Sequence, residues 1–210
     1  MIYICVIQSR KVALVIAGLA SSLLCSTASA KDASIAEIVG QLQRGGYVIV
    51  MRHARSPNLQ PSASAADPQN PQRQRQLDQI GRQSAKQMGM ALKALRIPIG
   101  EVWSSPTYRA LQTIKLAEFP HPRIVTAIGA DAAAEGAIWL QNQASRPPRP
   151  GTDTLIVTHY PNITVAFGKA AGAAADGEAI VFRPGAPLSI VGRIKIEQWP
   201  RFVRCLHSRL

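Results

Sequence analysis

Two histidines and two arginines are the residues of this sequence best suited to chemistry. Arg52 and His53 directly follow an apolar run, Arg109 comes shortly after a second run, and His159 follows the most apolar run of the chain. Arginine binds a phosphoryl group through paired hydrogen bonds, and a neutral imidazole can attack phosphorus. No Asp or Glu lies beside these residues in the sequence, so the set is cationic and suits a dianionic phosphate.

Short apolar runs that alternate with helical patterns must position these residues. The predicted strands are 47–51, 101–105, 123–127, 154–158, 179–182 and 188–196. The predicted helices are 77–95, 107–119, 132–143 and 162–171. This alternation predicts an α/β three-layer sandwich, a mostly parallel sheet with helices on both faces. The carboxyl ends of parallel strands meet at one edge of a sheet, so the four residues should converge there.

The first 30 residues have the features of a secretory signal peptide. Arg10 and Lys11 precede an apolar stretch over 12–24, and small residues at 28–30 form a cleavage site. That stretch is shorter than the roughly 20 residues a membrane span needs. We therefore expect cleavage after Ala30, a periplasmic or secreted location and no stable membrane span afterwards. An uncleaved membrane anchor is the alternative.

The chain after cleavage reads as one domain, 31–200, followed by a basic tail, 201–210. Loss of Arg10 and Lys11 lowers the formal net charge from +12 to +10, and Cys205 is the one cysteine left, so no intrachain disulfide can form. The positive charge suits an anionic substrate or an anionic envelope, or else is spread over a solvated surface. Aromatic residues make up only 5% and do not alternate with basic ones, so no nucleic-acid partner is expected.

Four motifs stand in order along the chain, each at a predicted strand or helix. They are Arg52-His53-Ala54, the Leu-then-Gly-Arg-x-x-Ala pattern at 77–85, Ser-Ser-Pro-x-x-Arg-Ala-x-x-Thr at 104–113, and Val-Thr-His at 157–159. Together they resemble the histidine phosphatase superfamily (branch 1, exported bacterial type), whose fold is phosphoglycerate mutase-like. The resemblance covers about residues 45–199. Ala54 replaces a usual Gly, and Tyr160 stands where Gly or Asn is usual.

The resemblance implies a phosphomonoester hydrolase that works through a phosphohistidine intermediate. His53 would be the nucleophile, and Arg52, Arg109 and His159 would hold the non-bridging oxygens and stabilise the transition state. The resemblance implies no metal and no cofactor, and the sequence shows no Cys, His or carboxylate spacing typical of a metal site.

The resemblance implies two further roles in this mechanism. Ser56 and Asn58 stand where family members often add hydrogen bonds to the phosphate. Hydrolysis of an alkyl phosphate also needs a proton donor for the leaving oxygen. Glu178 is the leading candidate, because related exported members carry a Gly-Glu before an apolar strand, and Asp131 and Glu135 are the alternatives.

The expected activity is therefore hydrolysis of a small anionic phosphorylated substrate, for instance a phosphorylated envelope sugar. A non-catalytic phosphate-binding protein of the same fold and a phosphohistidine-protein phosphatase are the alternatives. The polar segment 57–76, with Arg73 and Arg75 near its end, is either a lid that sets substrate choice or a surface loop.

Overall fold

The computed structural model describes residues 30–57, 70, 72 and 74–207. The predicted signal peptide up to residue 29 and most of the candidate lid lie outside the described residues. The helices are α1 (Ala30–Leu42), α2 (Gln79–Ala94), α3 (Tyr108–Leu116), α4 (Ala133–Ser145), α5 (Tyr160–Ala171) and α6 (Trp199–His207), with short 3₁₀ turns η2 (Thr126–Ile128) and η3 (Ile196–Gln198). The strands are β1 (Val48–Arg52), β2 (Ile99–Ser104), β3 (Arg123–Ile124), β4 (Asp153–Thr158), β5 (Ala179–Arg183) and β6 (Ser189–Ile194).

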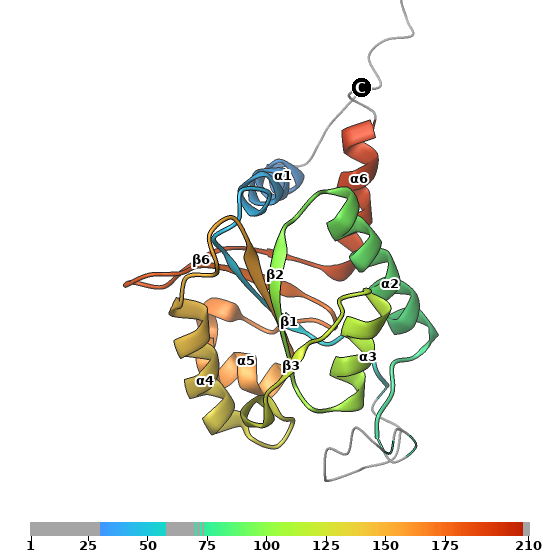
Figure 1. Ribbon diagram of the computed structural model, residues 1–210, viewed down its shortest axis with the longest axis vertical. Helices are drawn as coiled ribbons and strands as arrows, with labels where there is room; N and C mark the ends of the chain where they lie inside the picture. The colour runs from blue at the N-terminus through green and yellow to red at the C-terminus, as the bar shows by residue number, and fades with distance from the viewer. Residues whose placement is uncertain (1–29, 58–69, 71, 73, 208–210) are drawn as a thin grey trace, which may run out of the picture.

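The six strands form one sheet in the order β3-β2-β4-β1-β5-β6. The first four in that order are parallel, whereas β5 and β6 are antiparallel to their neighbours. Figure 1 shows α2, α3 and α6 on one side of this sheet and α4 and α5 on the other. The predicted three-layer α/β fold with a mostly parallel sheet is confirmed.

The central strands are continuous apolar runs because both of their faces are covered by helices. Side chains alternate between the two faces of a strand, so each strand supplies two separate cores. In β1, Ile49 and Met51 pack in the core on the α2 side, whereas Val48 and Val50 pack in the core on the α4 and α5 side. These two cores fix the position of β1 and therefore of the Arg-His pair at its end.

Two helices differ from the expectations. The segment before the first strand forms α1, in which Ile38, Val39 and Leu42 are buried. The basic tail was predicted from residue 201, but residues 201–207 belong to helix α6. Trp199 and Phe202 of this helix are buried in the core on the α2 side. The apolar side chains of α6 recur at helical spacing, which outweighs the basic residues between them. The folded domain therefore extends past residue 200.

Two boundaries also differ in ways that affect the site. The third strand is only two residues long and gives way to η2, because the chain turns back toward the carboxyl edge of the sheet there. Helix α5 begins at Tyr160, two residues before the predicted Asn162, with His159 at its N-cap position. Among the described residues, none of the helices combines the length and apolar character that crossing a bilayer demands.

Candidate active site

The two histidines are brought together by the pairing of β1 with β4. These strands are parallel, with Arg52 opposite Thr158, so His53 and His159 follow at equivalent positions. The amide of His53 donates to the carbonyl oxygen of Thr158 at 3.0 Å, which continues the ladder one step past the strands. The two imidazole rings lie 5.3 Å apart between centroids. The predicted convergence at the carboxyl edge is therefore present in the structure.

His53 is buried and held as a neutral imidazole. Its Nδ1 lies 2.8 Å from the carbonyl oxygen of Ala54, a contact in which Nδ1 must carry the proton and donate. Its Nε2 accepts from Nε of Arg109 at 3.1 Å. Burial lowers the pKa of His53 to about 3, and the charges of Arg109, Arg52 and Arg75 add to this effect. The bond to Ala54 acts in the opposite direction but is outweighed. The unprotonated Nε2 is thus available as a nucleophile near neutral pH.

His159 is also buried and has the opposite tautomer. Its Nδ1 lies 3.2 Å from Nη2 of Arg109, which can only donate, so Nδ1 accepts. Its Nε2 lies 2.7 Å from Oγ of Ser105 and therefore donates to it. Burial, then the nearby His53 and Arg109, lower the pKa of His159 well below its ordinary value. Arg109 thus bridges the two rings with different guanidinium nitrogens.

Thr113, the last residue of the Ser-Ser-Pro motif, joins the backbone at Arg109 to the loop after the nucleophile. Thr113, one turn after Arg109 in α3, donates its hydroxyl to the carbonyl oxygen of Arg109 at 2.8 Å. The same hydroxyl accepts from the amide of Ala54 at 3.1 Å, which links α3 to the residue after the nucleophile. Burial lowers the pKa of Arg109 to about 10, with Arg75 adding to the effect and Asp131 opposing it, so Arg109 stays cationic.

Arg52 is held by the loop that precedes β5. Its Nη2 lies 2.6 Å from Oδ1 of Asp176, and its Nη1 donates to the carbonyl oxygen of Ala174 at 3.0 Å. The guanidinium also stacks near the ring of Tyr160, 5.8 Å from its centroid. Its Nε is buried and has no hydrogen-bond partner among the described residues. A phosphoryl oxygen would supply the acceptor that this buried donor lacks.

Of Ser56 and Asn58, the two residues predicted to add hydrogen bonds to the phosphate, the structure describes only Ser56. Ser56 is buried, and its hydroxyl donates to the carbonyl oxygen of Gln76 at 2.7 Å. That bond joins the two ends of the polar segment. The hydroxyl of Ser56 therefore holds these two ends together. Asn58 lies outside the described residues.

Glu178, the leading candidate for the proton donor, is bound on both carboxylate oxygens. Arg193 donates from Nε to Oε1 at 2.9 Å and from Nη2 to Oε2 at 2.8 Å, and the amide of Ala175 donates to Oε2 at 2.9 Å. Burial raises the pKa of Glu178, but the bonds from Arg193 and Ala175 outweigh it, and the net shift is downward. A carboxylate held ionised in this way is poorly suited to donate a proton.

The other two candidate acids lie between η2 and the first turn of α4. Asp131 is exposed on the turn after η2, and its negative charge raises the pKa of Arg109. Glu135 is exposed in the first turn of α4. Of the three candidates, Asp131 is the one whose charge acts on a residue of the histidine cluster.

Two charged groups belong to this site although the motif analysis assigned them no role. Asp176 forms the ion pair with Arg52, and Arg75 lowers the pKa of both histidines. Both stand in irregular segments whose path the sequence pattern does not predict. Asp176 was visible only as an acid beside Glu178, and Arg75 only as a basic residue near the end of the polar segment. Among the described residues, no three His, Cys, Asp or Glu side chains could share a metal ion.

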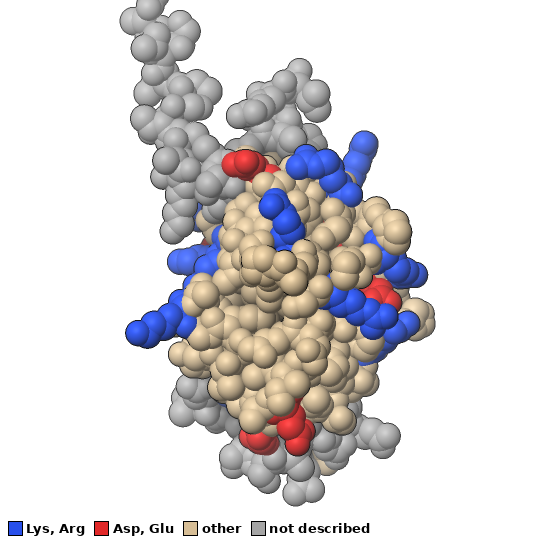
Figure 2. Space-filling model, turned by 90° about the vertical axis from the view of Figure 1, so that its left-hand side faces the viewer, with Lys and Arg blue, Asp and Glu red and all other residues tan. Residues whose placement is uncertain are grey.

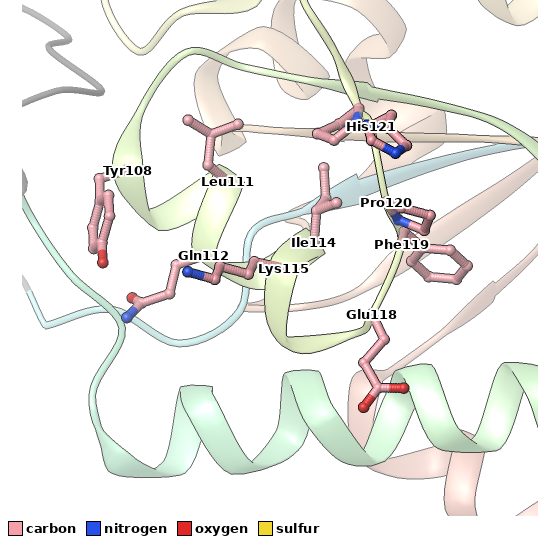
Figure 3. A pocket seen from close by; sticks show the side chains of 10 residues that line it. Tyr108, Leu111, Gln112, Ile114, Lys115, Glu118, Phe119, Pro120 and His121 are labelled. Atoms are coloured by element: carbon pink, nitrogen blue, oxygen red, sulfur yellow. The ribbon is translucent and has the colours of Figure 1, made fainter.

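A separate cavity of about 470 Å³ lies along α3 (Figure 3). Tyr108, Leu111 and Lys115 line it from the helix, and Phe119 and His121 line it from the segment that follows. Its lining includes none of the predicted site residues. His121 belongs to none of the four motifs, and it lies at the wall of this cavity.

The basic residues are not gathered into one patch on the face shown in Figure 2. Lys and Arg side chains lie scattered around the margins and the upper half of this face, and an uncharged area covers its centre. On this face the positive charge is spread over the surface. The arginines whose charges act on His53 are Arg109, Arg52 and Arg75.

Comparisons with known proteins find one matching family and several similar folds. Residues 48–131, which contain three of the four motifs, match the model of the histidine phosphatase superfamily (branch 1). The structure of the protein histidine phosphatase SixA complexed with tungstate superimposes with a TM-score of 0.56 at 16% identity, over 72% of this chain and 98% of that one. The structure of SixA from Agrobacterium tumefaciens superimposes with a TM-score of 0.52 at 17% identity, over 71% of this chain and 97% of that one. No curated protein sequence matches significantly. Residues 48–131 thus resemble the histidine phosphatase superfamily, branch 1, and the chain shares the fold of the SixA proteins.

Proposed function

We propose that the protein is an exported phosphomonoester hydrolase that works through a phosphohistidine on His53. The observation that carries this proposal is the environment of Nε2 of His53. That nitrogen is unprotonated and faces Arg109, while the ring is fixed by the bond from Nδ1 to Ala54. A buried neutral imidazole among three arginines is the arrangement that attack on a phosphoryl dianion requires.

In the first step, Nε2 of His53 attacks phosphorus and the bond from phosphorus to the leaving oxygen breaks. Arg109 exchanges its contact with Nε2 for a phosphoryl oxygen, and Nε of Arg52 gains the acceptor that it lacks. His159, whose Nε2–H is directed to Ser105, keeps Arg109 in place. In the second step, water attacks the phosphohistidine, which releases phosphate and restores the neutral imidazole.

We assign the proton for the leaving oxygen to Asp131. This residue is exposed on the turn after η2, and its negative charge raises the pKa of Arg109. Glu178, whose carboxylate is fixed by Arg193, instead supports the loop that holds Arg52.

The direct test is hydrolysis of p-nitrophenyl phosphate in the presence of EDTA, from pH 4 to 8, beside His53→Ala and His53→Asn. We expect activity in the unmodified protein and a loss of at least about a thousandfold in both variants, because the nucleophile is absent. Rapid quenching should trap an acid-labile phosphoryl group in the active protein only. Equal activity in all three proteins would refute the assignment of His53.

A phosphohistidine phosphatase is the second candidate. Two solved structures that superimpose with TM-scores above 0.5 are SixA proteins, one of them a protein histidine phosphatase. Imidazole is a good leaving group, so this reaction depends less on a carboxyl donor. Comparing phosphoimidazole with an alkyl phosphate decides between the two candidates. A strong preference for phosphoimidazole that persists in Asp131→Asn would favour the second.

Export and the substrate are part of the same proposal. The signal peptide motif and the formal charge of +10 after its removal support a periplasmic or secreted enzyme that acts on an anionic envelope compound, such as a phosphorylated sugar. Cell fractionation with antibody detection tests the location. A full-length chain found in the cytoplasm would contradict it. Folded protein that binds phosphate without hydrolysing any phosphomonoester would instead indicate the non-catalytic alternative.

A further inference from the structure

Arg75 lies beside the histidine cluster because two backbone carbonyls hold its side chain there. Its Nε donates to the carbonyl oxygen of Pro57 at 3.1 Å, and its Nη2 donates to that of Ser56 at 2.9 Å. Both acceptors follow the Arg-His motif within a few residues. Together with the bond from Ser56 to Gln76, these contacts hold the end of the polar segment next to the residues that follow His53.

The charge of Arg75 acts on both histidines and on Arg109. It lowers the pKa of His53, His159 and Arg109, in each case in addition to the larger effect of burial. Burial also lowers the pKa of Arg75 itself, while Asp176 opposes this. A third arginine therefore shares the electrostatic environment of the site with Arg52 and Arg109.

The neighbouring Gln74 adds an unsatisfied buried donor. The residue is only 3% exposed, and its Oε1 accepts from the amide of Tyr108 at 2.5 Å, at the start of the helix that carries Arg109. Its Nε2 has no hydrogen-bond partner among the described residues. A buried amide nitrogen without a partner is costly, so an acceptor from a ligand would be favourable there.

The ion pairs of the three arginines differ. Within the part of the chain that the structure describes, Arg52 is paired with Asp176, whereas neither Arg75 nor Arg109 has a carboxylate within ion-pair distance. One phosphoryl dianion is accounted for by Arg109 and the Nε of Arg52, the two donors that the proposed mechanism assigns to it. Arg75 thus remains as a cation beside the phosphoryl site with no anion assigned to it.

We propose that Arg75, with Nε2 of Gln74, binds a second anionic group of the substrate, so the enzyme prefers phosphoryl compounds that carry a carboxylate or further phosphate close to the reacting phosphoryl group. This inference rests on the proposed function, because it takes the His53 cluster as the phosphoryl site. It narrows the substrate class to compact compounds with two anionic groups.

Two phosphonates of similar size test the proposal without hydrolysis. Phosphonoacetate carries a carboxylate where ethylphosphonate carries a methyl group, and neither has a phosphorus–oxygen ester bond to break. We expect calorimetry on the full chain to give a Kd for phosphonoacetate at least about tenfold lower, the size typical of one charged hydrogen-bonded contact. Arg75→Gln should bring the two Kd values within about twofold of each other, and Arg75→Lys should keep part of the preference.

The control is Arg149→Gln. Arg149 also donates to a backbone carbonyl, that of Gly100, but it precedes β4 and so lies at the opposite edge of the sheet. This variant should retain the preference of the unmodified protein. Thermal melts of all variants report whether loss of the Ser56 and Pro57 contacts has unfolded the chain. If Arg75→Gln does not fold, the partial loss of preference in Arg75→Lys becomes the deciding result.

The proposal is overturned if the unmodified protein binds both phosphonates equally or binds neither. It is also overturned if Arg75→Gln or Arg75→Lys weakens both to the same extent, because that pattern is expected when Arg75 only holds the end of the polar segment in place. Hydrolysis is a separate result. A retained preference for phosphonoacetate in a protein that does not hydrolyse p-nitrophenyl phosphate would refute the proposed function and leave the second anion site standing.

Discussion

His53 is held neutral far below the pH at which a free imidazole gains its proton. Since burial lowers its pKa to about 3, its Nε2 should stay unprotonated throughout the pH range of the assay. We predict that ¹⁵N chemical shifts of the His53 ring show a proton on Nδ1 alone from pH 8 down to about 4.5. A midpoint near 6.5 would contradict the role of burial and of the surrounding arginines.

The role of Asp131 predicts a dependence on the leaving group. Asp131→Asn should lower kcat on an alkyl phosphate by roughly a hundredfold, because the alkoxide must leave without a proton. The loss on p-nitrophenyl phosphate should be within about threefold, since p-nitrophenolate leaves readily. Glu135→Asn serves as the matched control and should change neither rate. Equal losses on both substrates in Asp131→Asn would show that this residue does not donate the proton.

At the scale of single residues, sequence predicted the part of the site that lies on regular structure. His53, Arg109 and His159 follow apolar runs or begin a helix, and the sheet brings such positions to one edge. Arg75 and Asp176 could not be placed in this way, because each depends on how an irregular segment folds back. The position of Glu178 was visible, but the partner that decides its chemistry, Arg193, lies on another strand.

The loop between α5 and β5 is the element that most directly supports Arg52. Arg193 on β6 reaches across β5 to bind Glu178 and donates to the carbonyl oxygens of Ala171 and Ala173. One arginine thus fixes both ends of the loop. The loop in turn supplies Asp176 and the carbonyl oxygen of Ala174 to Arg52.

We predict that Glu178→Gln raises KM severalfold and lowers stability by about 2 kcal/mol, because Arg193 loses its charged partner in a largely buried place. The ratio of rates on p-nitrophenyl and alkyl phosphates should not change. Kinetics on both substrates and urea unfolding measure these effects. A selective loss on the alkyl phosphate would instead restore Glu178 as the proton donor.

Among the elements, the central strands and long helices were predictable because their periodicity is strong. Helix α6 was not predicted, although Trp199, Phe202 and Val203 recur at helical spacing, since its basic residues resemble a solvated tail. Helix α1 was not predicted either, because it begins where the signal peptide is expected to end. Strand β3 is shorter than its apolar run, since the chain leaves the sheet to form η2.

For the molecule as a whole, stability should depend on Asp153, a fully buried carboxyl at the start of β4. Its Oδ1 accepts from the amide of Tyr47 at 2.9 Å, and its Oδ2 has no hydrogen-bond partner among the described residues. Burial raises its pKa to about 7, against the smaller opposite effect of the Tyr47 bond. The folded state therefore holds a proton that the unfolded state releases above about pH 4, so this group's contribution to stability falls as pH rises from about 4 to 7.

Asp153→Asn keeps the acceptor for Tyr47 and cannot ionise. We predict that this variant matches the unmodified protein in urea unfolding at pH 4 and is more stable by roughly 2 kcal/mol at pH 8. The two buried histidines titrate equally in both proteins, so the difference between them isolates Asp153. A variant that is less stable at both pH values would show that the carboxyl is ionised and paired in the fold.

The adjacency of β1 and β4 has a consequence for how activity returns after denaturation. His53 and His159 are more than a hundred residues apart in the sequence, and their alignment depends on pairing two strands across that distance. Closing so long a loop is slower than forming local helices. In a refolding experiment, helical circular dichroism should therefore recover first, and phosphate-ester hydrolysis should appear only with the last step of sheet assembly.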